Sequence, residues 1–170
     1  GGSQMSGSRT YGLSLERDLI RVDVDGVMYA LEISRIREIV NPLTIIELPR
    51  ERDFVLGVAE YRDEVVAVVD LRSLFGLART DEDRRTKWII LESSRGLVAV
   101  VVDGVRDVFA SSGNQRRQVP VLDEHQVERG IQSAFQHDDG LVFLLDADRI
   151  AEPGIAIRPD DVVYLPSEAP

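Results

Sequence analysis

The chain has 170 residues, no cysteine, and a formal net charge of −10 at pH 7 from 20 Lys and Arg against 30 Asp and Glu. This length can bury one sizeable core or two small ones, and the lack of cysteine excludes disulfides, thiolate nucleophiles and cysteine-ligated zinc. The acidity argues against nucleic acid and anionic membrane partners, which are bound through cationic side chains. The chain contains no run of about 18 apolar residues, so we expect no transmembrane helix.

Most of the chain consists of short apolar runs between Gly-marked polar turns, a pattern typical of small β-barrels. Asp25-Gly26 and Asp103-Gly104 have the composition of tight hairpin turns. In chain order we expect a loose polar arm over 1–17, which includes a cloning remnant before Met5, and a tail over 151–170. Between them we expect strands at 19–24, 27–33, 43–48, 58–61, 65–69, 88–91, 97–102, 105–109, 131–135 and 141–145. We expect a helical turn leading into a strand at 34–40, and helical turns at 51–54, 71–75 and 146–150.

The hairpin from Phe54 to Gly76 is the most strongly patterned stretch. Val65–Val69 is nearly all β-branched, which predicts a strand buried on both faces. The tip between the two strands, Glu60–Glu64, is charged. Asp70 closes the second strand, and we expect it to cap a one-turn helix that Gly76 ends.

Parts of the first half recur in the second half. The unit of strand, Asp and helix at 65–74 returns at 141–150, and Ile36–Ile39 returns as Val105–Val108. The recurring units keep their order, so we expect two similar β subdomains with a boundary in the polar loop 78–87. The alternative is a chance likeness of two β-rich stretches.

The search for a catalytic constellation is negative. His125 and His137 lie in polar segments without ligand-like spacing, which favours surface roles. Asp70, Asp103 and Asp146 each end a strand, where capping and turn formation explain them. Motifs for phosphate loops, nucleophile elbows and dinucleotide binding are absent. We therefore expect no enzyme, no metal and no cofactor.

The chain has more apolar strand residues than these roles explain. The matched positions Ile36, Ile39, Val105 and Val108 could be ordinary core or could line a seam between the subdomains. The pattern alone leaves both interpretations open.

Several ordered motifs resemble the CheW-type adaptor family between about residues 19 and 150. They are Gly26-x-x-Tyr29-x-Leu31-x-Ile33-x-x-Ile36-Arg37-Glu38-Ile39, Pro49-x-x-x-x-Phe54-Val55-x-Gly57-Val58, Tyr61-Arg62, Val68-Val69-Asp70-Leu71-Arg72 and Val101-Val102-Asp103-Gly104-Val105-x-Asp107-Val108. At the hairpin tip the chain has Glu60-Tyr61-Arg62-Asp63, where the family usually has Asn-Leu-Arg-Gly.

The resemblance implies two intertwined five-stranded SH3-like barrels with a few short helices. It implies a cytoplasmic, non-enzymatic adaptor that is recruited to receptor arrays and couples methyl-accepting chemoreceptors to a CheA-type histidine kinase. One face of the first barrel would pack on the kinase's regulatory domain, which is itself CheW-like, or on another CheW-like domain. The receptor's cytoplasmic tip would lie in the groove between the barrels.

Carried over by motif, the candidate interaction positions are Ile36, Glu38, Gly57, Arg62, Val105 and Val108. With neither a kinase core nor a receiver in the chain, a free-standing adaptor is favoured, and an excised domain is the alternative. The alternative function is a small-ligand or peptide-binding β-barrel module outside chemosensory arrays, and an enzyme comes third.

Overall fold

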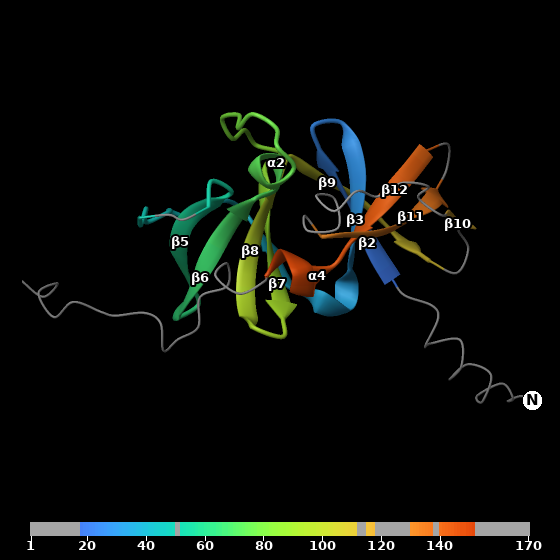
Figure 1. Cartoon of the computed structure of the whole chain (residues 1–170). Coiled ribbons are helices and arrows are strands. Elements are labelled where there is room, and N and C mark those ends of the chain that lie inside the picture. Colours follow the sequence, from blue (N-terminus) through green and yellow to red (C-terminus); the bar gives the residue numbers. More distant parts are fainter. Residues whose placement is uncertain (1–17, 50–51, 112–114, 118–129, 138–139, 152–170) are drawn as a thin grey trace, which may run out of the picture.

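The protein is mainly β, with two sheets and a few one-turn helices, as expected (Figure 1). The computed structural model describes residues 18–49, 52–111, 115–117, 130–137 and 140–151, so the expected arm 1–17, His125 and the tail after residue 151 lie outside the described residues. Within the described part of the chain, no helix is long and apolar enough to span a bilayer.

The first sheet has five strands in the order β4-β7-β8-β6-β5. Its strands are β4 (Ile36–Val40), β5 (Val55–Tyr61), β6 (Glu64–Asp70), β7 (Lys87–Ser93) and β8 (Gly96–Val102). Strands β6 and β8 are parallel, and the other neighbours are antiparallel. The 3-10 helix η1 (Ile33–Arg35) precedes β4, and the helix α2 (Leu71–Leu74) follows β6.

The second sheet has six strands in the order β10-β11-β12-β3-β2-β9. Its strands are β2 (Asp18–Val24), β3 (Val27–Glu32), β9 (Gly104–Ala110), β10 (Gln115–Arg117), β11 (Ile131–His137) and β12 (Gly140–Leu145), followed by the helix α4 (Ala147–Ile150). The three-residue β10 extends an otherwise five-stranded arrangement.

The two sheets share one topology. The order β4-β7-β8-β6-β5 corresponds to β9-β2-β3-β12-β11, including one parallel pair in each sheet. The registers of the parallel pairs agree: Ala67–Val98 and Val68–Ala99 correspond to Phe143–Tyr29 and Leu144–Ala30. The repetition in the sequence is therefore a repetition in three dimensions.

The sheet topology corrects the expected boundary at 78–87. This loop joins α2 to β7, and the strands on both of its sides belong to the five-stranded sheet. The loop separates two sequence repeats, but each repeat gives its first hairpin, β2–β3 or β7–β8, to the sheet of the other repeat. A repeat kept to itself would leave strand edges unpaired, so sequence repeats and spatial units differ.

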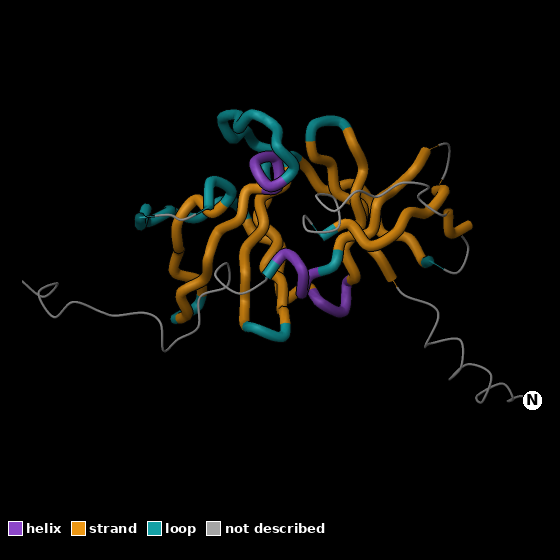
Figure 2. The backbone as a smooth tube through the Cα atoms, viewed as in Figure 1, coloured by secondary structure: helices purple, strands orange, loops and turns teal. Residues whose placement is uncertain are grey.

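Among the described residues, apolar side chains form three clusters. One is shared by both sheets with α2 and α4, the second lies within the five-stranded sheet, and the third lies within the six-stranded sheet. Along β6, Val66 and Val68 join the second cluster, whereas Ala67 and Val69 join the shared one. Because successive side chains point to opposite faces, the expectation of a strand buried on both faces is confirmed. Figure 2 shows α2 and α4 near the junction of the two sheets.

Residues 34–40, expected as a helical turn leading into a strand, are the end of η1 followed by β4, which pairs with β7. Three other local expectations differ from the structure. The strand expected at 43–48 is reduced to a single bridge between Ile46 and Val58, and residues 52–54 form a bend and turn rather than a helix. Asp70 occupies the N-cap position of α2 but accepts a hydrogen bond from the Ser73 hydroxyl, not from a backbone N–H.

Candidate partner-binding site

Glu38 and Arg62, which the resemblance marked separately, form one ion pair. Arg62 lies at the tip between β5 and β6, and Glu38 lies on the edge strand β4. The guanidinium donates through Nε to Glu38 Oε1 at 2.9 Å and through Nη2 to Oε2 at 3.0 Å. The hydroxyl of Tyr61 donates to the same Oε1 at 2.7 Å. These bonds fasten the hairpin tip to the edge strand of its own sheet.

These contacts change the acid–base properties of the three side chains. The hydrogen bond from Arg62, followed by that from Tyr61, lowers the pKa of Glu38 from 4.5 to about 2. The bond to Glu38 raises the pKa of Arg62 above its ordinary value. Burial, reinforced by the bond to Glu38, raises the pKa of Tyr61. Glu38 is therefore a firmly ionised carboxylate across the physiological range.

The hairpin tip is a two-residue turn with positive φ at Arg62 (47°) and Asp63 (68°). Glycine is the usual residue for such turns, so the chain accepts backbone strain here. Arg62 remains 68% exposed. Among the described residues, no cation lies within ion-pair distance of the carboxylates of Glu60 and Asp63, while Glu64 lies 3.7 Å from Arg37. The tip therefore presents an arginine that is already paired, with acidic neighbours.

Gly57 is buried beneath a covering segment, residues 45–47. Its φ is +148°, and a Cβ at this position would lie 2.3 Å from the backbone oxygen of Ile46 and 3.0 Å from a side-chain carbon of Ile45. Ile46 exchanges both backbone hydrogen bonds with Val58, at 2.7 and 2.9 Å. Glycine is required here because the segment 45–47 lies directly on β5.

The apolar candidate positions divide between core and surface. Ile36 on β4 and Val105 on β9 are half-buried against the shared cluster. Val108 on β9 is 59% exposed, and Ile39 on β4 is 36% exposed. The strand registers confirm the sequence match, because Ile36 and Val105 hold equivalent places, as do Ile39 and Val108.

A second acidic–basic pair lies at the place equivalent to Glu38. Asp107 on β9 accepts from Arg21 Nε at 2.8 Å and from Nη2 at 3.2 Å. Nε2 of His137, at the place equivalent to Tyr61, lies 3.8 Å from Asp107, and the imidazole stacks on Phe109 with ring centroids 4.1 Å apart. Arg21 and Asp107 were not among the candidate site residues, although the match of Glu38 with Asp107 in the repeat could have indicated them. His137 was expected at the surface, whereas its side chain is only 13% exposed.

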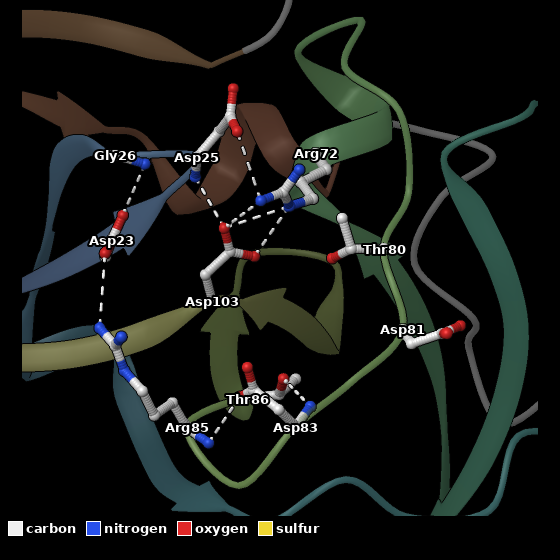
Figure 3. A pocket seen from close by; sticks show the side chains of 10 residues that line it. All are labelled: Asp23, Asp25, Gly26, Arg72, Thr80, Asp81, Asp83, Arg85, Thr86 and Asp103. Atoms are coloured by element: carbon white, nitrogen blue, oxygen red, sulfur yellow. Dashed lines mark hydrogen bonds and ion pairs between the residues drawn. The ribbon is translucent and has the colours of Figure 1, made fainter.

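A polar cavity of about 250 Å³ lies where the chain crosses from one sheet to the other (Figure 3). Arg72 of α2 donates to Asp103 through Nε and Nη2, at distances of 2.8–3.1 Å. Asp103 also accepts from the backbone N–H of Asp25 at 2.7 Å, and the buried Asp23 accepts from Arg106 at 2.8 Å. Asp103, expected to be a turn residue, thus also ties α2 to the turn between β2 and β3.

The corresponding connection at α4 has the charges of the Arg72–Asp103 connection reversed. Asp148 of α4 stands where α2 has Arg72, and it accepts from Arg35 and from the backbone N–H of Ser94. Bonds from Arg35 and then Ser94 lower the pKa of Asp148. Within the described residues no group of His, Cys, Asp and Glu side chains could hold a metal ion. Both ties are interpreted as structural connections between the repeats.

The chain matches the model of a known protein family and several proteins of known name. The model of the CheW-like domain matches residues 18–153. The chain belongs to the CheW-like domain family. It is 27% identical over 113 residues to the chemotaxis protein CheW of Klebsiella aerogenes, covering 66% of this chain and 68% of that protein. It is 26% identical over 138 residues to the CheW of Thermotoga maritima, covering 81% and 89%.

The solved structure of the scaffolding protein TtCheW from Thermoanaerobacter tengcongensis has the same fold. It superposes with a TM-score of 0.70 at 18% identity, covering 79% of this chain and 91% of that one. The CheW-like fold therefore accounts for the two sheets and their exchange of hairpins. The Glu38–Arg62 pair and the Asp107–Arg21 pair occupy corresponding edges of this fold.

Proposed function

We propose that the protein is a non-enzymatic adaptor that couples chemoreceptors to a CheA-type histidine kinase in a bacterial chemosensory pathway. Membership of the CheW-like family carries this proposal, since the family match spans residues 18–153. The curated relatives are named chemotaxis proteins, and the structural neighbour is named a scaffolding protein. The adaptor would work in the cytoplasm at receptor arrays, without a cofactor.

The partner surface we propose comprises the exposed positions at the edges of the two sheets. Glu38 and Arg62 offer a fixed ion pair beside Ile39, and Val108 offers an apolar side chain on the edge strand β9. Edge strands are ready sites for association with another protein. Ile36, Gly57 and Val105 would act indirectly, by packing behind this surface and shaping it.

Binding measurements test this function. The full chain is titrated with the regulatory domain of a CheA-type kinase and, separately, with a soluble fragment of a chemoreceptor's cytoplasmic tip. We expect saturable binding to both partners that is unchanged by chelators or nucleotides. Val108→Asp should weaken binding of at least one partner by about fivefold or more. The same protein failing to bind either partner would remove the proposal and favour a peptide-binding module outside chemosensory arrays.

Melting experiments test the absence of a cofactor independently. A ligand that binds only the folded state raises its melting temperature by mass action. We therefore expect divalent metals, chelators and nucleotides to leave the melting temperature of the isolated protein unchanged. A reproducible rise with any one of them would identify a ligand and argue against a simple scaffold.

A further inference from the structure

We propose that a second cavity, at one end of the five-stranded sheet, binds a small organic cation that has an ammonium group on a short apolar body. This cavity has a volume of about 250 Å³ and lies between the sheet and the loop 78–86. It adjoins the polar cavity of Figure 3 and shares Arg72, Thr86 and Asp103 with it. The inference goes beyond the proposed adaptor function and does not depend on it.

One wall of the second cavity is apolar. It is formed by Ile45, Leu56, Trp88 and Val101, which belong to the cluster within the five-stranded sheet or pack against it. An apolar cavity of about 150 Å³ is enough to hold benzene. The second cavity therefore has room for an apolar body of that size together with a charged group.

Asp70, at the end of β6, supplies a buried carboxylate in the same cavity. Its side chain is only 8% exposed. The hydroxyl of Ser73 donates to Oδ2 at 2.8 Å, but among the described residues no group donates a hydrogen bond to Oδ1. A buried carboxylate oxygen without a donor is costly, and the ammonium group of a ligand would satisfy it.

The equivalent residue of the other repeat shows that helix capping does not explain Asp70. Asp146 accepts a hydrogen bond from the backbone N–H of Asp148 at 2.9 Å and so caps α4. Asp70 occupies the N-cap position of α2 without making such a bond. Its carboxylate lines the second cavity, whereas Asp146 lines neither cavity.

The charged side chains of the wall leave an excess of negative charge. They are Asp70, Arg72, Arg79, Asp81, Glu82 and Asp103. Arg72 is already bonded to Asp103 at 2.8–3.1 Å, so these two charges balance each other. Arg79 is 56% exposed and its Nε lies 3.8 Å from Asp70 Oδ2. Three carboxylates therefore face one loosely held arginine, which favours a cationic ligand over an anionic one.

The kind of cation follows from the two walls. No group of His, Cys, Asp and Glu side chains in the described part of the chain could hold a metal ion. A buried carboxylate beside an apolar wall instead suits an ammonium group with an apolar body, because ligand pockets combine apolar lining with a few placed polar groups.

The experiment titrates the full-length protein with benzylammonium chloride at constant ionic strength. Benzyl alcohol and benzoate serve as neutral and anionic probes of similar shape. The readout is the fluorescence of Trp88, the only tryptophan in the chain, which lines the cavity. We expect saturable binding of benzylammonium with a Kd of about 1 mM or lower, at least about tenfold weaker binding of benzyl alcohol, and none of benzoate. Benzylammonium should also raise the melting temperature.

Two pairs of variants locate the site. Asp70→Asn should weaken binding of benzylammonium at least about tenfold, while Asp146→Asn, at the equivalent position, should stay within about twofold of wild type. Arg79→Ala removes the cation beside Asp70 and should tighten binding about threefold to tenfold. Arg84→Ala removes the same charge from the same loop at a position that lines neither cavity, and it should stay within about twofold.

Several results overturn the inference. Wild type that gives no saturable response to benzylammonium, or that binds benzyl alcohol equally well, has no ammonium site in this cavity. Equal affinities of Arg79→Ala and Arg84→Ala would show that the ligand does not reach Asp70, and this comparison decides the question if Asp70→Asn folds poorly. None of these titrations uses the kinase or the receptor, so their failure leaves the adaptor proposal untouched.

Discussion

Glu38 on β4 and Asp107 on β9 hold the same place in two sheets of the same topology, and each carboxylate accepts two bonds from one arginine. Their arginines differ in origin. Arg62 comes from a hairpin tip, whereas Arg21 comes from β2, the strand next to β9. One pair therefore closes an outward-facing tip, and the other lies along the sheet. A repeated fold thus keeps the position of a charge while changing what it is used for.

A third side chain lies beside each of these two ion pairs, and it also differs between the sheets. A tyrosine hydroxyl donates to Glu38, whereas a histidine ring lies near Asp107 and stacks on Phe109. The ties between the repeats show a similar exchange, with Arg72 bonded to Asp103 on one side and Asp148 bonded to Arg35 on the other. The repeats therefore differ in these charged and polar side chains, while their strand topology is the same.

The largest expected effects test whether the two sheets have equivalent cores. Val68 and Leu144 occupy matched positions and are almost fully buried. Val68 lies in the apolar cluster within the five-stranded sheet, and Leu144 lies in the one within the six-stranded sheet. Truncation of either to Ala should lower the free energy of unfolding by about 2–4 kcal/mol, measured by urea denaturation. A loss below about 1 kcal/mol at one site only would show that one sheet packs loosely there.

Gly57 and Ser133 are matched positions that the structure distinguishes. Both follow a bulge, but of the two only Gly57 has a positive φ, and the segment 45–47 covers it. Gly57→Ser should therefore lower stability by about 2 kcal/mol, whereas Ser133→Gly should lower it by at most about 1 kcal/mol. Equal losses in chemical denaturation would contradict the proposed role of the covering segment.

The two ties between the repeats should differ in strength. Arg72 is 17% exposed and Arg35 is 32% exposed. Arg72→Met leaves Asp103 without its bidentate partner in a polar cavity and should lower stability by about 1–2 kcal/mol. Arg35→Met removes a more accessible pair and should lower stability by about 0.5 kcal/mol. The reverse order in paired urea titrations would mean that the cavity is well solvated.

The smallest expected effect is a pH dependence of the melting temperature that comes from Glu38. The folded-state pKa of Glu38 is lowered from 4.5 to about 2, so its pair stabilises the fold fully above the unfolded value and is lost as the pH falls through this window. The melting temperature of wild type should exceed that of Glu38→Gln at neutral pH, and the difference should shrink between about pH 4.5 and 2. A difference that does not depend on pH would argue against ionic stabilisation by Glu38.

The sequence predicted the β class, most strands and the internal repetition, because alternating burial and Gly-marked turns are local signals. Val65–Val69 is an example: its β-branched residues reflect clusters on both faces of β6. The exchange of hairpins could not be predicted in this way, since pairing of β3 with β12 is a non-local property. The partner of Arg62 was equally hidden, because Glu38 lies 24 positions away in the chain.

The exchange of hairpins has a consequence for cutting the chain. A break in the loop 78–86 would give two fragments, each holding strands of both sheets, so neither fragment would contain a complete sheet. Each fragment alone should remain unfolded. The two fragments mixed together should refold around the apolar cluster that both sheets share. The protein is therefore suited to fragment complementation, in which reporter halves regain structure only when they meet.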